Sequence, residues 1–147
     1  MMRRVLVVLL LSACGARPQA FDWARVQPGD SVGVWRVVQR DVRPDPGERG
    51  WIGDVRYAGE AEVSGMFQAH PDSELHALCF FVDESDRGIL PRFPNDVRKP
   101  WFCFTNEDGV RPVASEGMHA RIRIADYRYL YSHTDVYNTA RFVALAR

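Results

Sequence analysis

The chain has 147 residues, of which 46% are hydrophobic and 26% charged, so it is long enough to bury one core and lacks the composition of a disordered polypeptide. Nineteen basic residues balance nineteen acidic ones, and Lys99 is the only lysine. Such a chain has no net basic field to draw it onto nucleic acid or an anionic bilayer, so neither is expected as an electrostatic partner.

The first fourteen residues are arranged like a bacterial export signal. Arg3 and Arg4 precede an aliphatic run from Val5 to Leu11, and small residues lead to a cysteine. The quartet Leu11-Ser12-Ala13-Cys14 resembles the lipobox of bacterial lipoproteins. The resemblance implies cleavage before Cys14 and covalent attachment of lipid to its thiol and amine. The alternative is an ordinary signal peptide; a transmembrane helix would need about twenty apolar residues.

The same resemblance implies a place in the cell. The protein is expected in the bacterial cell envelope, attached to a membrane through the lipid on Cys14. In proteobacterial lipoproteins an Asp after the lipidated cysteine resembles an inner-membrane retention signal. Gly15 therefore favours an outer membrane, on the periplasmic side, where the organism has one. We expect a signal peptide over residues 1–13, a lipidated tether over 14–30 and a β-barrel domain over 31–147.

Short apolar runs separated by turn sequences indicate a mainly β domain. Gly65 interrupts one run and indicates a bend or bulge. The six predicted strands span residues 31–39, 60–68, 75–82, 101–105, 118–131 and 138–145. Residues 41–53 and 83–100 are rich in proline, glycine or charge and predict loops. Asn106-Glu107-Asp108-Gly109 indicates a turn, and only residues 112–118 and 135–140 leave room for short helices.

The strand order after residue 60 favours a small barrel. Three strands, a connecting segment and a two-stranded hairpin follow one another as in a five-stranded OB-type barrel. Val63-Ser64-Gly65, Cys103-Phe104 and the stretch from Gly117 to Ile122 resemble motifs of small exported OB-fold proteins of the tRNA-anticodon-binding-like kind. The predicted fold is therefore mainly β, a small OB-like barrel with an extra N-terminal strand. A lipocalin-like or other meander barrel is the alternative.

Two cysteines remain once Cys14 is assigned to the lipid. Cys79 and Cys103 lie in apolar, strand-like runs, and export places them where disulfides form. A bond between them would close a loop of about 24 residues and contribute about 3 kcal/mol in the chain-entropy model. Two separate buried thiols are the alternative, and the disulfide is favoured. Redox catalysis is not expected, because the chain has no CxxC motif.

The strand over residues 118–131 carries the candidate binding residues. In a regular strand, Arg121, Arg123, Tyr127 and Tyr129 share one face. Cations beside aromatic rings suit a sugar, an anionic ligand or single-stranded nucleic acid, although export argues against nucleic acid. The preferred alternative is a solvated face whose arginines pair with acids such as Glu60 and Glu62, and whose tyrosines cover the barrel edges.

Nothing in the chain predicts catalysis or a metal site. The motifs of zinc proteases, α/β-hydrolases, nucleotide-binding loops and EF-hands are absent. Ser132, His133 and Asp135 lie on one turn, where adjacent side chains do not converge as a triad, and Asp83, Glu84 and Asp86 indicate solvated charge. Residues 88–94 either form an apolar docking loop or, the preferred interpretation, fold back and bury Ile89, Leu90 and Phe93.

These features predict a non-catalytic, membrane-anchored envelope lipoprotein whose barrel contacts another envelope protein. The alternative is an OB-fold module that binds a sugar or anionic ligand through Arg121, Arg123, Tyr127 and Tyr129. An enzyme is the least favoured class, and no cofactor or metal is expected beyond the covalent lipid on Cys14.

Overall fold

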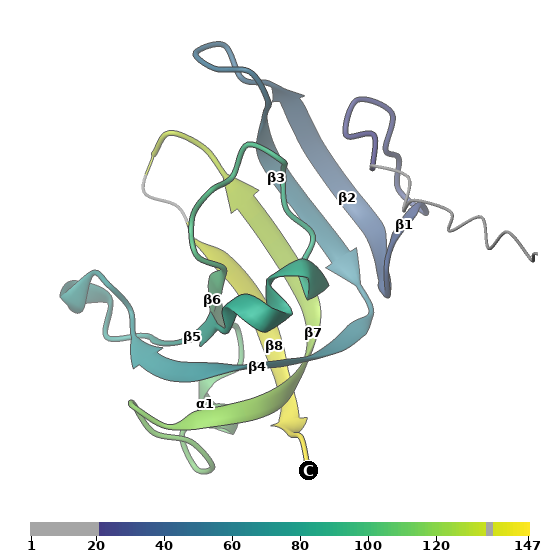
Figure 1. Cartoon of the computed structure of the whole chain (residues 1–147). Helices are drawn as coiled ribbons and strands as arrows, with labels where there is room; N and C mark the ends of the chain where they lie inside the picture. The colour runs from purple at the N-terminus through teal and green to yellow at the C-terminus, as the bar shows by residue number, and fades with distance from the viewer. Residues whose placement is uncertain (1–20, 135–136) are drawn as a thin grey trace, which may run out of the picture.

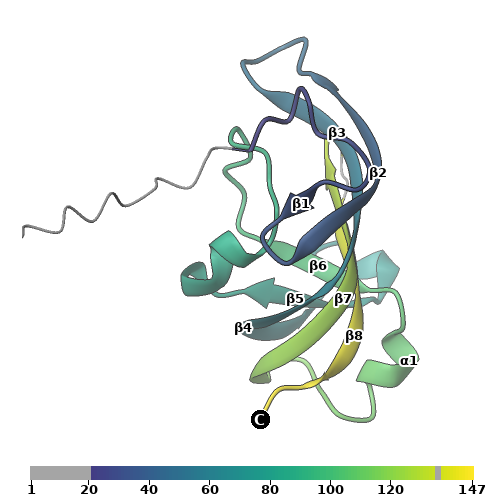
Figure 2. The same cartoon turned by 90° about the vertical axis from the view of Figure 1, so that its right-hand side faces the viewer.

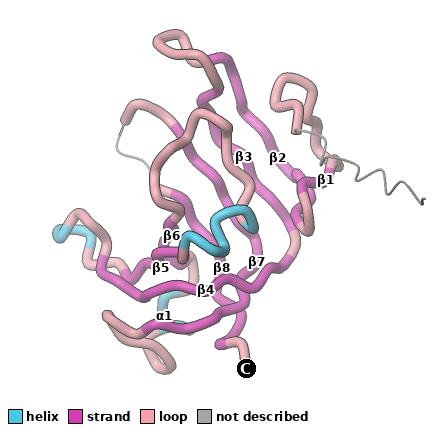
Figure 3. The backbone as a smooth tube through the Cα atoms, in the orientation of Figure 1, coloured by secondary structure: helices cyan, strands magenta, loops and turns pink. Residues whose placement is uncertain are grey.

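One strongly bent sheet of eight strands makes up most of the protein (Figure 1). The computed structural model describes residues 21–134 and 137–147, so the predicted signal peptide and Cys14 lie outside the described residues. The strands are β1 (Ser31–Val32), β2 (Trp35–Pro44), β3 (Trp51–Ala58), β4 (Glu60–Ala69), β5 (Leu78–Val82), β6 (Trp101–Phe104), β7 (His119–Tyr131) and β8 (Asn138–Leu145). Helical segments are short (Figure 3): α1 (Glu107–Val110) and two 3-10 turns, Ser73–Leu75 and Glu84–Ile89. Among the described helices, none has the length and apolar character needed to cross a bilayer.

Five of the strands, β4 to β8, close into a barrel. Antiparallel pairs join β4 to β5, β5 to β6 and β7 to β8, while β6 and β8 run parallel. Pairing between β4 and β7 closes the ring. The elements follow the order of an OB-type barrel, which is three strands, then a helix (here α1), then a hairpin. The predicted mainly β fold and small OB-like barrel are confirmed.

Gly65 lies where β4 turns from one neighbour to the other. It is paired with Ala120 of β7 and with Val82 of β5, so the strand passes between two partners at this residue. A Cβ at Gly65 would lie 2.1 Å from the carbonyl oxygen of Phe81 and 2.8 Å from the ring of Phe80. The glycine therefore allows the close backbone approach that closes the barrel.

Three strands precede the barrel, where one was predicted. The expected strand over residues 31–39 is β1 and the start of β2, separated by a turn at Gly33, whose φ is 59°. Most of the expected loop over residues 41–53 belongs instead to β2 and β3. A Cβ at Gly53 would lie 2.1 Å from the carbonyl oxygen of Asp41, so this glycine serves close strand packing and not a loop. β3 pairs with the C-terminal half of β7 and extends the sheet beyond the barrel.

The short helix also differs from the expectation. α1 occupies Glu107–Val110, where the sequence indicates a turn, and residues 112–118 contain no helix. Asp135 and Val136, in the second expected helical stretch, lie outside the described residues, and β8 begins at Asn138. Glu107 is held by two donors, the backbone N–H of Leu78 and the guanidinium of Arg111, which stabilises a single helical turn at this position.

The described part of the predicted tether packs onto the domain. Trp23 is 4% exposed and Val26 is 2% exposed, and the Trp23 ring meets the edge of Phe93 at 4.6 Å between centroids. Arg40 of β2 donates from Nη2 to the carbonyl oxygen of Trp23 at 2.9 Å. Gly29 and Asp30 exchange backbone hydrogen bonds with Val37. Residues 21–30, the described part of the expected tether, are therefore part of the folded domain.

Figure 2 shows β1, β2 and β3 from the side. Against their inner side the hydrophobic core continues beyond the barrel, because Trp35, Val37, Val55 and Tyr57 belong to the same cluster as the barrel residues. The connection from β5 to β6 covers it, with Leu90 and Phe93 at 3% and 2% exposure. The Trp35 indole donates to the carbonyl oxygen of Ile89 at 2.9 Å. The preferred interpretation of residues 88–94, a segment folded back on the domain, is confirmed for Leu90 and Phe93, while Ile89 is half-buried against the same core.

Candidate functional site

A β-bulge separates the two arginines of the predicted binding face from its two tyrosines. Asp126 has a φ of 52°, and the pairing of β7 with β8 shifts register between Ala125 and Arg128. Before the bulge the odd-numbered residues point outward; after it they point inward, because an extra residue reverses the alternation. The prediction that Arg121, Arg123, Tyr127 and Tyr129 share one face is therefore wrong.

Both arginines pair with acids on β4. Arg121 Nε lies 3.0 Å from Glu62 Oε2, and Arg123 Nε lies 3.7 Å from Glu60 Oε2, with all four side chains about half exposed. The expectation that acids of the neighbouring strand neutralise these arginines is confirmed. Exposed pairs of this kind contribute little to stability.

Both tyrosines belong to the core. Tyr127 is 1% exposed and its ring stacks near Tyr57 at 6.1 Å, while Tyr129 is fully buried. Burial raises the pKa of each phenol, so both stay neutral. A ligand cannot reach either ring from solvent in this structure.

Asp96 holds the β5–β6 connection to the sheet through a buried ion cluster. Its side chain is 1% exposed and lies 3.0 Å from Arg92 Nη2 and 3.0 Å from Arg98 Nε. The Tyr129 hydroxyl donates to Asp96 at 2.9 Å. Burial works to raise the pKa of Asp96, but the hydrogen bond from Arg98 and the charges of Arg92 and Arg98 outweigh it, so that pKa is lowered. With its oxygens engaged in this way, Asp96 is not placed to act as a general base.

Cys79 and Cys103 form a disulfide between directly opposite positions of β5 and β6. The predicted bond is confirmed. Phe80 and Phe102 are fully buried in the barrel, so the alternate residues, the two half-cystines with Phe81 and Trp101, belong to the outer face.

The outer face of β5 and β6 carries a row of aromatic rings. Phe81 and Trp101 are cross-strand partners whose ring centroids lie 5.4 Å apart with an interplanar angle of 5°. Tyr137, just before β8, continues the row at 6.1 Å and 20° from Trp101. We call Phe81, Trp101 and Tyr137 the aromatic stack. His70 sets its ring edge-on against Trp101 and Tyr137.

The aromatic stack is accessible from solvent. Phe81 and Trp101 are half-buried, and Tyr137 is 36% exposed, as is Met66, the β4 partner of Phe81. This surface is not evident from the sequence, because the run that ends in Leu78-Cys79-Phe80-Phe81-Val82 is apolar on both faces and indicates a strand buried on both sides. The signal was the disulfide itself: residues two positions from Cys79 and Cys103 must share the outer face with them.

A hollow of about 450 Å³ lies beside the aromatic stack. It carries one basic and two acidic side chains, so its charge is mixed. Its lining residues are Met66, Gln68, Phe81, Val82, Asp83, Glu84 and Lys99. His70 also borders a larger hollow, of about 680 Å³, below the β4–β5 loop.

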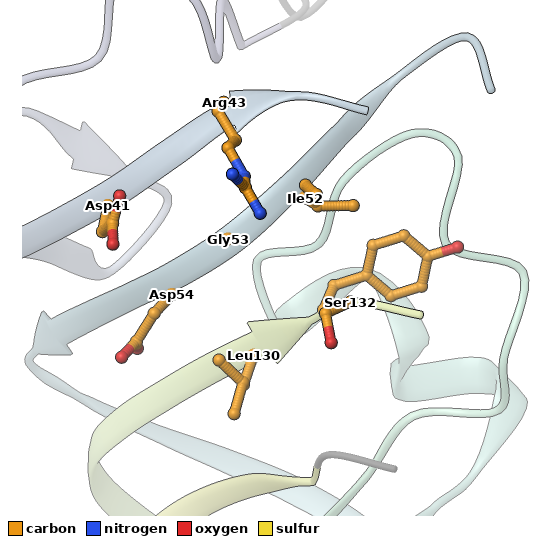
Figure 4. A pocket seen from close by; sticks show the side chains of 8 residues that line it. Asp41, Arg43, Ile52, Gly53, Asp54, Leu130 and Ser132 are labelled. Carbon is orange, nitrogen blue, oxygen red and sulfur yellow. The ribbon is translucent and has the colours of Figure 1, made fainter. Parts of the chain in front are cut away.

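A third hollow, of about 350 Å³, lies over the outer face of β2, β3 and β7 (Figure 4). Asp54 is engaged here by Arg128, whose Nη2 and Nε lie 2.6 and 3.0 Å from its two carboxylate oxygens. Asp41 and Arg43 extend from β2, and in Figure 4 these side chains do not converge on one point with Asp54. The hollow therefore has no evident arrangement for acid–base chemistry.

His133 pairs with a buried carboxylate rather than with its sequence neighbours. Its Nε2 lies 2.9 Å from Asp45 Oδ1, and this hydrogen bond raises the pKa of His133 and lowers that of Asp45. The Ser132 hydroxyl lies 2.7 Å from Thr134 Oγ1, and Asp135 lies outside the described residues. The imidazole thus joins the β2–β3 turn to the β7–β8 loop.

No three His, Cys, Asp or Glu side chains gather as metal ligands within residues 21–134 and 137–147.

Comparison of the chain with protein-family models, with curated proteins and with solved structures returns no match.

Proposed function

We propose that the protein is a lipid-anchored binding module of the bacterial cell envelope, and that its OB-like barrel contacts another envelope protein through the aromatic stack. The anchor is argued from the lipobox-like quartet ending at Cys14. The binding surface is argued from one observation: Phe81, Trp101 and Tyr137 form an ordered, solvent-accessible row on the outside of the barrel.

The composition of this surface is that of a protein interface. Aromatic residues and methionine are enriched at the centre of such interfaces, and Trp and Tyr dominate their binding energy. Phe81, Trp101, Tyr137 and the neighbouring Met66 provide this composition in one place. In OB barrels generally, the face of the second and third strands binds ligands, and β5 and β6 hold those positions here.

The aromatic stack is also pre-organised. The rings already pack on one another, and the Cys79–Cys103 disulfide ties the two strands together two positions away from Phe81 and Trp101. Side chains ordered before binding lose less entropy when a partner arrives. A fixed array of rings therefore converts more of its contact energy into binding affinity.

The charges around the stack favour a protein over an anionic ligand. Lys99 is accompanied by Asp83 and Glu84 in the adjacent hollow. This leaves no cationic surplus to attract phosphate groups or nucleic acid. A sugar or anion site formed by Arg121, Arg123, Tyr127 and Tyr129 is not proposed further, because the four side chains lie on opposite faces.

The ion pairs described above favour binding over catalysis, because they occupy the acids and the histidine. Asp96 lies between two arginines, Asp54 is held by Arg128, and Asp45 is held by His133. A general acid or base needs a reactive position facing substrate, and these pairs leave their carboxylates committed to structure.

Site-specific photo-crosslinking in native cells tests the binding surface. A benzophenone amino acid replaces Tyr137 in one full-length variant and Arg123 in a control. We expect an ultraviolet-dependent adduct with one envelope protein from position 137 only, lost when Trp101→Ala is added. Equal adducts at both positions, or an adduct that survives Trp101→Ala in a folded protein, contradict the proposal. If the protein instead co-sediments with purified wall polysaccharide and Trp101→Ala abolishes this binding, the partner is a glycan and not a protein.

The anchor is tested separately with an alkyne fatty acid. We expect the full chain to take up the label and to fractionate with membranes, and the Cys14→Ala variant to do neither. An unlabelled, soluble wild type contradicts the lipoprotein assignment.

A further inference from the structure

We infer that the side of the domain formed by residues 21–30 and the β1–β2 hairpin lies against the bilayer surface, with Val34 and Val38 in contact with lipid. We call this side the entry face. The inference rests on the proposed lipid anchor at Cys14, and it concerns a different surface from the aromatic stack.

The first argument is the length of the connection. Only residues 15–20 separate the proposed anchor from Phe21, the first described residue. Seven Cα–Cα steps span at most about 25 Å even when fully extended. A domain of this size has a radius of gyration of about 14 Å, which corresponds to a sphere about 36 Å across. The connection is shorter than the domain, so the entry face stays turned toward the membrane.

The second argument is that the chain enters the domain at a fixed point. Trp23 is nearly fully buried, packs against Phe93 and accepts a hydrogen bond from Arg40 through its carbonyl oxygen. The backbone hydrogen bonds of Gly29 and Asp30 with Val37 continue this attachment along β2. The anchor therefore acts on the edge of β2 and not on a distant flexible linker.

The third argument is the chemistry of that edge. Val34, in the turn between β1 and β2, is 63% exposed, and Val38, next to Val37, is 47% exposed. Arg36 lies between them and is exposed. In residues 21–30 the Arg25 side chain is 88% exposed and pairs with Asp22 at 3.5 Å. Exposed aliphatic side chains with an arginine between them suit the boundary between acyl chains and headgroups, where the apolar part is buried and the guanidinium stays in water.

The fourth argument is the position of the aromatic stack. In the sheet order, β3, β7 and β4 separate β1 and β2 from β5 and β6. Figure 1 shows β1 and β2 on one side of the molecule and β5 on the other. With the entry face on the membrane, the aromatic stack faces the aqueous compartment, where a protein partner can reach it.

Depth-dependent fluorescence quenching tests this orientation on the lipidated, full-length protein in phosphatidylcholine–phosphatidylethanolamine vesicles. Cys79 and Cys103 are paired and Cys14 carries lipid, so a new cysteine accepts an environment-sensitive dye selectively. The variants are Val34→Cys, Val38→Cys and, as a control on the exposed segment after β6, Thr105→Cys.

We expect spin-labelled lipids to quench dyes at positions 34 and 38 at least threefold more than the dye at position 105. Insertion of twenty Gly/Ser residues after residue 20 should remove most of this difference. Three results overturn the inference. They are equal quenching at all three positions, stronger quenching at position 105, and a quenching pattern that the insertion leaves unchanged. Mass spectrometry of Cys14 on the same samples separates this failure from failure of the anchor itself.

Discussion

Tyr129 on β7 donates its hydroxyl hydrogen to Asp96, 2.9 Å away and 33 residues earlier in the chain. The same hydroxyl oxygen accepts the backbone N–H of Phe93 at 3.2 Å. A phenol that the sequence pattern places on a ligand-binding face thus ties the β5–β6 connection to the sheet.

Asp96→Asn is expected to lower the free energy of unfolding by about 3–5 kcal/mol, because it removes the buried negative charge that Arg92 and Arg98 face. Asp126→Asn is the matched control: its carboxylate is exposed and pairs with Arg141, and asparagine tolerates its left-handed backbone. Denaturant titration followed by circular dichroism measures both. Similar losses in the two variants would mean that the Asp96 cluster does not stabilise the fold.

Tyr129→Phe is expected to cost about 1–3 kcal/mol, since it removes a donor from a buried carboxylate. Arg121→Ala and Arg123→Ala are each expected to cost less than about 1 kcal/mol, because their ion pairs are exposed. Thermal unfolding of the three variants gives the comparison. A larger loss for either arginine than for Tyr129 would contradict the placement of these side chains.

Gly65→Ala is expected to destabilise the protein by about 2 kcal/mol or more, because its new Cβ would overlap the Phe81 carbonyl oxygen and the strand cannot move without opening the barrel. Gly88→Ala is the control, since a Cβ there meets nothing within 4 Å. The midpoint of urea unfolding should fall for the first variant only. Equal midpoints would show that β4 accommodates the methyl group.

Removing the disulfide by Cys79→Ala with Cys103→Ala is expected to cost about 3 kcal/mol, given the sequence separation of 24 residues. Reductant should destabilise the wild type by a similar amount and leave the double variant unchanged. If reductant destabilises both proteins equally, its effect does not come from this bond.

The His133–Asp45 pair predicts a pH dependence of stability. The folded-state pKa of His133 is raised above 6.5, so its contribution is complete below pH 6.5 and is lost as the pH rises through the folded value. The pKa of Asp45 is lowered below 3.8, so its contribution is present above pH 3.8 and is lost as the pH falls through the folded value.

The melting temperature of wild type should therefore exceed that of His133→Gln by more at pH 5.5 than at pH 8.5. Thermal melts across this range test it, with His119→Gln, at an exposed pair with Asp83, as the control. A difference that is constant or grows with pH would show that the pair is not the source.

Prediction from the sequence succeeds where one local pattern decides the outcome. Apolar runs locate the barrel strands, and two cysteines in an exported chain imply a disulfide. It fails where the outcome depends on distant partners. β3 begins at Trp51 although the proline- and glycine-rich stretch 41–53 suggests a loop, because Gly53 faces the backbone of β2 at close range. Trp23 and Val26 look like part of a linker, yet they fill a core whose other wall comes from residues 83–100.

The candidate surface was missed for a related reason. Phe81 and Trp101 look like core residues in a run that is apolar throughout, and only the pairing of β5 with β6 places them together on the outside. Tyr127 and Tyr129 look like surface residues because strict alternation is assumed through Asp126. Local periodicity says nothing of an inserted residue or of which face a neighbouring strand covers.

The bulge at Asp126 gives one strand two phases. The first half of β7 turns Ile122 and Ile124 into the barrel, and the second half turns Tyr127 and Tyr129 into the part of the core beside β2 and β3, although these sets differ in parity. If β7 kept Asp126 but ran as a regular strand, the two sets would lie on opposite faces, with either the tyrosines or the isoleucines turned out of the core. This one extra residue thus allows the same strand to belong to a closed barrel and to an open three-stranded extension.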